Sequence, residues 1–226
     1  MCLALVQELA KHKPQGHVIA PSELTAWLRK YITDTDVQIN TRRSASVDFG
    51  CAIVGGLYDS ESEKEDLPCI EIYIAYHPDQ QHLELSTFDW ERLCFDVAEC
   101  IGHEQVHKDQ QHRRKKKTFK QYASKETAKE KRNEQEYLGS TDEIEAYGFS
   151  IAAELAVKFN AFEVNDALLA QVFMWQVYTK TFDTDQSVLL KLRKQISKYL
   201  RRLEVDYNDK TNHPRRNPRA RRARST

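Results

Sequence analysis

The sequence predicts an α+β fold in which a small β-sheet packs on two helices, one with an HExxH string and one that carries glutamates, with additional helices toward the C-terminus. Residues 46–56 end at a glycine turn, and residues 69–76 alternate β-branched and aromatic residues, which is typical of strands. From Ser86 onward the apolar residues recur at helical spacing instead. The order of two strands followed by a series of helices indicates the α+β class.

Length and composition fit one folded domain, which we expect to span residues 1–207. The chain has 226 residues, of which 40% are hydrophobic and 10% aromatic, enough to bury a core. No apolar run approaches the roughly 18 residues that cross a bilayer, so we expect no membrane partner. Five cysteines without metal-type spacing, and no leader-like start, predict a cytoplasmic protein.

Capping and turn residues predict the remaining elements. We expect a helix that ends before Lys13, a second helix over 22–32 and a solvated acidic loop over 59–66. The capping signature at Ser86 opens a helix that continues past His107. The apolar face of that helix is predicted to consist of Trp90, Leu93, Cys94, Val97 and Ile101.

A second capping signature at Ser140 opens a helix that carries two glutamates in its first turns. Two further helices are predicted, over 167–178 and 186–203. This gives the sheet a set of helical partners that follow it in the chain.

The formal net charge of zero conceals an uneven distribution. Residues 108–136 carry 11 Lys or Arg against five Asp or Glu, and residues 208–226 carry seven against one, so each segment has a net charge of +6. The other 178 residues have a net charge of −12. We interpret 108–136 as a basic insert or helix extension and 208–226 as a basic disordered tail. The tail is suited to nucleic acid or to an acidic protein partner.

The string His103-Glu104-Gln105-Val106-His107 has the spacing of a zinc-binding helix. Residues four apart share one helical face, so both imidazoles can reach one metal ion with Glu104 beside them. Two neutral imidazoles suit Zn2+, and Glu104 is placed to act as general base and then general acid. The alternative interpretation is a solvated glutamate and two histidines on a charged helical face.

A catalytic zinc site takes three protein ligands, and the helix that opens at Ser140 offers Glu143 and Glu145 as the third. Glu143 could instead close a capping box with Ser140, and Glu145 would then be the ligand. Tyr137 and Tyr147 flank the start of this helix. Each is either a donor to a developing oxyanion or a simple core or rim residue.

His112 lies five residues after His107, which turns it away from the face that carries the two histidines. We therefore interpret His112 as a solvated residue and not as a ligand.

These motifs resemble the small gluzincin-type HExxH zinc metallopeptidases, in particular ImmA/IrrE-like peptidases and phage-encoded zincin-like proteins. The resemblance covers about residues 70–160. Besides the HExxH string, it is carried by Glu143-Ile144-Glu145-Ala146-Tyr147, which looks like the family's E-x-E-A-[ND] segment. The resemblance implies a zincin-like fold, with Glu104 as the catalytic base and with His103, His107 and Glu143 as zinc ligands.

The resemblance carries two further implications. The family's Asp or Asn, which hydrogen-bonds a ligand imidazole, is Tyr147 in this sequence. The strand at 70–76 stands where gluzincins place an edge strand that pairs with an extended substrate.

The sequence thus predicts a zinc-dependent peptidase that hydrolyses a peptide or protein substrate with metal-activated water and a glutamate base. The alternative is a catalytically inactive zincin-scaffold protein that uses its basic segments on nucleic acid or a protein assembly. A third, simpler interpretation is a zinc ion that only holds two helices together.

Overall fold

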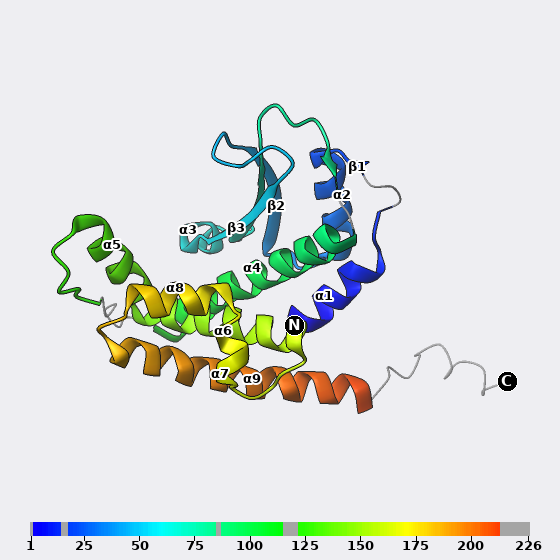
Figure 1. Cartoon of the computed structure of the whole chain (residues 1–226). Helices are drawn as coiled ribbons and strands as arrows, with labels where there is room; N and C mark the ends of the chain where they lie inside the picture. Colours follow the sequence, from blue (N-terminus) through cyan, green and yellow to red (C-terminus); the bar gives the residue numbers. More distant parts are fainter. Residues whose placement is uncertain (1, 15–17, 85–86, 115–121, 213–226) are drawn as a thin grey trace.

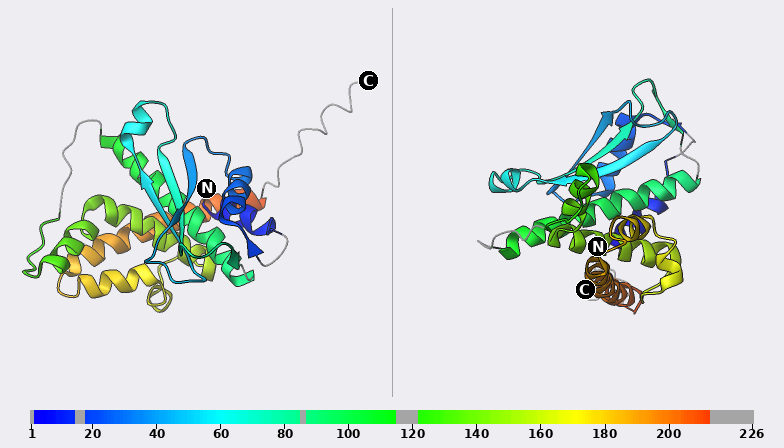
Figure 2. Two further views of the ribbon diagram at one scale, coloured as in Figure 1. Left: turned by 90° about the horizontal axis from the view of Figure 1, so that it is seen from above. Right: turned by 60° about the vertical axis from the view of Figure 1, so that its left-hand side comes forward.

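The structure, a computed structural model, describes residues 2–14, 18–84, 87–114 and 122–212. Figure 1 shows a small sheet on one side of the long helix α4 (Thr87–Arg114) and a layer of helices on its other side. The right-hand view in Figure 2 shows the same order of layers. The fold is therefore mixed α+β, as the sequence predicts.

The main sheet has the strand order β2 (Val37–Arg43), β4 (Ile70–Tyr76), β3 (Ala52–Tyr58). The central strand β4 runs parallel to β2 and antiparallel to β3, with Ile70 paired to residues on both sides. A second small sheet pairs β1 (Val18–Ile19) with β5 (Leu83–Glu84) in antiparallel register.

The position of β4 corrects one expectation. The resemblance implies an edge strand at 70–76, but this strand pairs on both sides and is the central strand of the sheet. Its alternate isoleucines are buried in the core. The edge strand that packs on α4 is β3. β3 begins at Ala52, later than the predicted start, because the residues before it form turns that include Gly50 at a φ of 88°. The predicted glycine turn at its end is wrong, since Gly55 and Gly56 pair with β4 and the strand continues to Tyr58.

Helix α4 is central because two of its faces are apolar. Its face toward the sheet buries the five predicted residues, Trp90, Leu93, Cys94, Val97 and Ile101, against β4 and α2 (Pro21–Tyr31). A second face buries Phe95, Ala98 and Val106 against the helical layer. The polar residues of the HExxH string occupy the remaining sector of the helix, between the two cores.

The helical layer is built around α6 (Thr141–Phe159), which packs on α4 and on α9 (Gln186–Asn212). Ser140 is the N-cap of α6, as predicted. The predicted helix at 167–178 is instead two helices, α7 (Asp166–Leu169) and α8 (Phe173–Thr181).

The first helix, the acidic segment and the last helix agree with expectation to different degrees. The first helix, α1 (Cys2–Lys11), ends where predicted. The acidic segment was predicted to be a loop but contains the short helix α3 (Ser60–Lys64), because Asp59 caps its start by accepting from the N–H of Glu61. Helix α9 extends to Asn212, five residues into the expected tail. The rest of that tail, 213–226, lies outside the described residues.

The basic segment 108–136 is divided between two helices. Helix α4 continues to Arg114, so the segment begins as a helix extension. Its last residues, 129–136, lie in α5 (Lys129–Leu138). Residues 115–121 between them lie outside the part that the structure describes. Across the described ranges, no helix combines the length and the apolar character needed to cross a membrane.

Candidate metal centre

The site forms where α4 and α6 approach each other closely. Gly102 makes the approach possible: a Cβ atom at this position would lie 2.3 Å from Cζ of Phe149 on α6. The next residue along α4 is His103. Ser140 fixes the start of α6, since its hydroxyl accepts from the backbone N–H of Glu143 at 3.3 Å. The first turn of α6 therefore faces the HExxH sector of α4.

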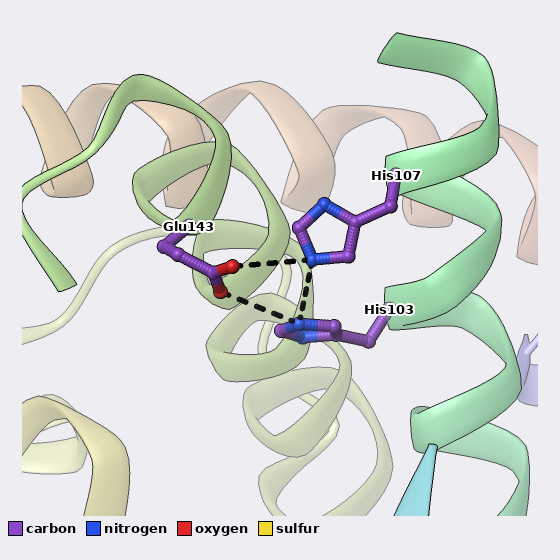
Figure 3. A group of neighbouring side chains, drawn as sticks. All are labelled: His103, His107 and Glu143. Atoms are coloured by element: carbon purple, nitrogen blue, oxygen red, sulfur yellow. Dashed lines mark hydrogen bonds and ion pairs between the residues drawn. The ribbon is translucent and has the colours of Figure 1, made fainter. Parts of the chain in front are cut away.

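Three of the predicted ligands converge on one point (Figure 3). The Nε2 atoms of His103 and His107 are 3.2 Å apart. Oε2 of Glu143 lies 3.7 Å from Nε2 of His103, and its Oε1 lies 3.5 Å from Nε2 of His107. All three ligand atoms lie within 4.8 Å of one another, and the side chains are largely shielded from solvent.

The outer nitrogens of both imidazoles have hydrogen-bond acceptors. Nδ1 of His107 lies 3.0 Å from the amide oxygen of Gln110, which can only accept. Nδ1 of His103 lies 3.0 Å from the hydroxyl of Ser150, whose proton is directed to the carbonyl of Ala146. Protons on both Nδ1 atoms leave both Nε2 lone pairs facing the Glu143 carboxylate.

A convergence of three electron-pair donors is stable only if a positive charge lies among them. Oε2 of Glu143 is buried and has no hydrogen-bond partner. Burial alone would lower the pKa of His103, but the carboxylates of Glu143, Glu99 and Glu104 outweigh it and raise that pKa, so the surroundings favour a cation. Two imidazoles and one carboxylate are also the ligand set of catalytic zinc sites in metalloproteases.

Glu104 lines the same open pocket as the three ligands, which has a volume of about 440 Å³. The strand β3 forms one wall of this pocket. Gly56 allows it to approach, because a Cβ there would lie 2.7 Å from Sγ of Cys100 and 2.8 Å from Cγ of Glu104. Burial raises the pKa of Glu104, while His103 and His107 oppose the rise. The carboxylate thus lies beside the convergence point and next to an edge strand.

Glu145 is not part of the group. Its carboxylate accepts from Lys198 at 2.7 Å, from Arg113 at 2.9 Å and from Gln110 at 3.3 Å. Burial tends to raise the pKa of Glu145, but the bonds from Arg113 and Lys198 lower it to about 2. The choice between the two glutamates therefore falls on Glu143, whose side chain turns to the histidines while only its backbone N–H caps the helix.

The two tyrosines occupy different positions. Tyr137 is an exposed residue that lines the pocket, and its hydroxyl lies against Tyr147 and Glu143. Partial desolvation and these two neighbours raise its pKa, so the phenol keeps its proton. Tyr147 packs edge-on to His103, with ring centroids 4.8 Å apart, and burial raises its pKa to about 12. No hydrogen bond joins Tyr147 to either imidazole among the described contacts. The expected acceptor roles belong to Ser150 and Gln110.

Sequence reasoning did not identify Ser150 and Gln110, although their spacing carries a signal. Ser150 lies seven residues after Glu143 on α6, and Gln110 lies seven after His103 on α4. Seven residues are close to two helical turns, so each lies on the ligand-bearing face of its own helix.

His112 was interpreted as solvated, and its side chain is 57% exposed. It also pairs with Glu63 of α3 at 2.7 Å between Nε2 and Oε1, which joins the end of α4 to the segment after β3.

Comparison of the chain with protein-family models, with curated proteins and with solved structures found no match.

Proposed function

We propose that the protein is a zinc-dependent peptidase of gluzincin type, with a zincin-like fold, in which His103, His107 and Glu143 hold one Zn2+. The observation that carries the proposal is the convergence of two imidazole Nε2 atoms and a buried carboxylate oxygen without a hydrogen-bond partner, beside Glu104 in one open pocket. A purely structural zinc site would be closed by a fourth protein ligand. The open side of this group instead faces the pocket.

Zinc bound at this position would supply a Lewis acid that activates a water molecule and polarises a peptide carbonyl. The carboxylate of Glu104 then accepts a proton from the attacking water as its oxygen adds to the carbonyl carbon. Glu104 passes the proton to the leaving amine nitrogen as the C–N bond breaks. The phenol of Tyr137 is placed to donate a hydrogen bond to the developing oxyanion.

The edge strand β3 supports a peptide as the substrate. Within the described residues, β3 pairs only with β4, so its other edge has no strand partner, and the backbone N–H of Tyr58 on β3 lies against the Glu104 carboxylate. Gly56, Leu57 and Tyr58 of this strand line the pocket together with Glu104. A substrate strand that pairs with β3 would carry its backbone carbonyls past the ligands.

The test compares zinc content and proteolysis for wild type and Glu104→Gln. Metal-free protein is reloaded with ZnSO4, zinc is counted by mass spectrometry, and cleavage of an unfolded protein is followed by new amino termini. We expect one zinc per chain in both proteins and a roughly 10²–10⁴-fold loss of cleavage rate in Glu104→Gln. Glu91→Gln, an exposed carboxylate of the same helix, is the control that keeps both properties.

A wild-type chain without zinc would overturn the proposal, as would a Glu104→Gln variant that cleaves at the wild-type rate. Stoichiometric zinc without any cleavage would support the non-catalytic zincin scaffold instead.

A further inference from the structure

Gln110 links the metal centre to the opposite side of α6. Its side chain is buried, with the residue 3% exposed. Its amide nitrogen donates to the carbonyl oxygen of Asp142 at 3.0 Å and to Oε2 of Glu145 at 3.3 Å. Because both of these partners are acceptors, they hold the NH2 end of the amide. The oxygen end must then face His107.

Glu145 is held from its other side by the C-terminal helix. Lys198 and Tyr199 of α9 donate to its Oε1 at 2.7 and 3.3 Å, and Arg113 of α4 donates to its Oε2 at 2.9 Å. The carboxylate is thus fixed by three side chains from two helices, and it uses one oxygen on Gln110. A glutamate that served only to pair α6 with α9 would not need the bond to Gln110.

We propose that Glu145 is a positioning residue for the metal centre: together with the carbonyl of Asp142, it orients the Gln110 amide so that the amide oxygen accepts the Nδ1 proton of His107 and leaves Nε2 for the ion. This inference rests on the metal-binding part of the proposed function and not on peptide cleavage. A turned amide would present NH2 to Nδ1 of His107, which would favour the tautomer with the proton on Nε2. That tautomer cannot bind a metal through Nε2.

The orienting role predicts a specific rescue. A carboxylate at position 110 has an acceptor at both ends, so either oxygen can accept from Nδ1 of His107, although the other oxygen then lies against the carbonyl of Asp142. Glu145→Leu should therefore weaken zinc binding in the presence of Gln110 but not in the presence of Gln110→Glu. If Glu145 acted only as a tether between helices, Gln110→Glu would restore nothing.

The experiment measures zinc affinity of the full chain by competition with a chelating dye, starting from metal-free protein. We expect Glu145→Leu to weaken binding about 10–100-fold, the range found when an outer partner of a ligand histidine is removed. The double variant Glu145→Leu with Gln110→Glu should bind zinc more tightly than Glu145→Leu alone. Glu154→Leu makes the same change at a glutamate further along α6 and should leave the affinity unchanged.

Thermal unfolding of the metal-free proteins reports separately on folding. If Glu145→Leu does not fold, Gln110→Met tests the link between Gln110 and His107, without which Glu145 has nothing to orient. This variant removes the acceptor of His107 and leaves Glu145 bonded to its cations, and its zinc affinity should fall by the same factor. Wild-type affinity in either single variant, or the absence of rescue in a folded double variant, would overturn the positioning role. If the wild-type chain itself bound no zinc, the proposed function would fail first.

Discussion

The hydroxyl of Ser150 lies 3.0 Å from Nδ1 of His103 and directs its own proton to the carbonyl of Ala146, one turn back along α6. A single side chain thus connects the backbone of one helix to a ligand of the other. Since the proton of the hydroxyl is committed, its oxygen can only accept from His103. The ring is held with Nε2 toward Glu143.

Replacement of Ser150 by alanine should therefore weaken zinc binding. We expect roughly a tenfold or larger loss of affinity, because Nδ1 of His103 loses its acceptor. The measurement is competition with a chelating dye. Ser197→Ala is the matched control, since this serine also bonds a carbonyl one turn back, but on α9 and away from the site. Equal affinities in wild type and Ser150→Ala would refute the role of the hydroxyl.

The two adjacent glycines of β3 separate catalytic from structural effects. A Cβ at Gly56 would meet Glu104, whereas a Cβ at Gly55 would lie 2.3 Å from Oη of Tyr73 on the other face of the sheet. Each alanine variant should lower the free energy of unfolding by about 1–3 kcal/mol, measured in urea. Only Gly56→Ala should also lower kcat per bound zinc. A similar loss of kcat in Gly55→Ala would mean that sheet distortion, and not displacement of Glu104, is responsible.

Removal of the Tyr137 hydroxyl should slow catalysis without loss of metal. In Tyr137→Phe we expect kcat to fall by up to roughly 10²–10³-fold, the cost of removing an oxyanion donor, while the chain still binds one zinc ion. Steady-state kinetics of the zinc-loaded protein checks this. Tyr31→Phe, on α2 in the other core, serves as the control. An unchanged kcat would identify Tyr137 as a rim residue.

The stability contributed by Glu63 should disappear in acid. Burial by itself raises the pKa of Glu63, but hydrogen bonds from Tyr58 and His112 and the charge of Lys108 together hold it below its ordinary value of 4.5. A depressed pKa stabilises the fold above the ordinary value, and the contribution is lost as pH falls through the lower, folded value.

Wild type should therefore exceed Glu63→Gln in unfolding free energy by an amount on the order of 1 kcal/mol at about pH 6, and the difference should shrink toward zero near pH 3. Urea unfolding at both pH values measures it. Glu61→Gln changes a more exposed carboxylate of the same short helix and should show little difference at either pH. A difference that persists in acid would contradict the assignment.

Local patterns were sufficient to predict the two helices that carry the candidate metal centre. The apolar residues of α4 recur at helical spacing, and the four-residue separation of His103 and His107 places them on one face. The predicted capping signature at Ser140 sets the start of α6, and with it the position of Glu143. Each of these signals lies within one element, so no knowledge of the tertiary arrangement was needed.

The features that were missed depend on partners distant in the chain. β2 was not predicted because its polar residues, such as Asn40 and Arg42, obscure its buried Ile39, and only pairing with β4 makes it a strand. The fate of Glu145 is decided by Lys198 and Tyr199, more than 50 residues later. No spacing rule within α6 could have distinguished it from Glu143.

The hydrogen bonds from α9 to Glu145 can form only late in synthesis of the chain. The proposed ligands and Glu104 leave the ribosome well before Lys198 and Tyr199, so the nascent chain would present its donor groups before α9 can hold Glu145. An ion captured at that stage would exchange readily, and firm retention would begin only when α9 docks. Metal retention would then report that the helical layer has closed.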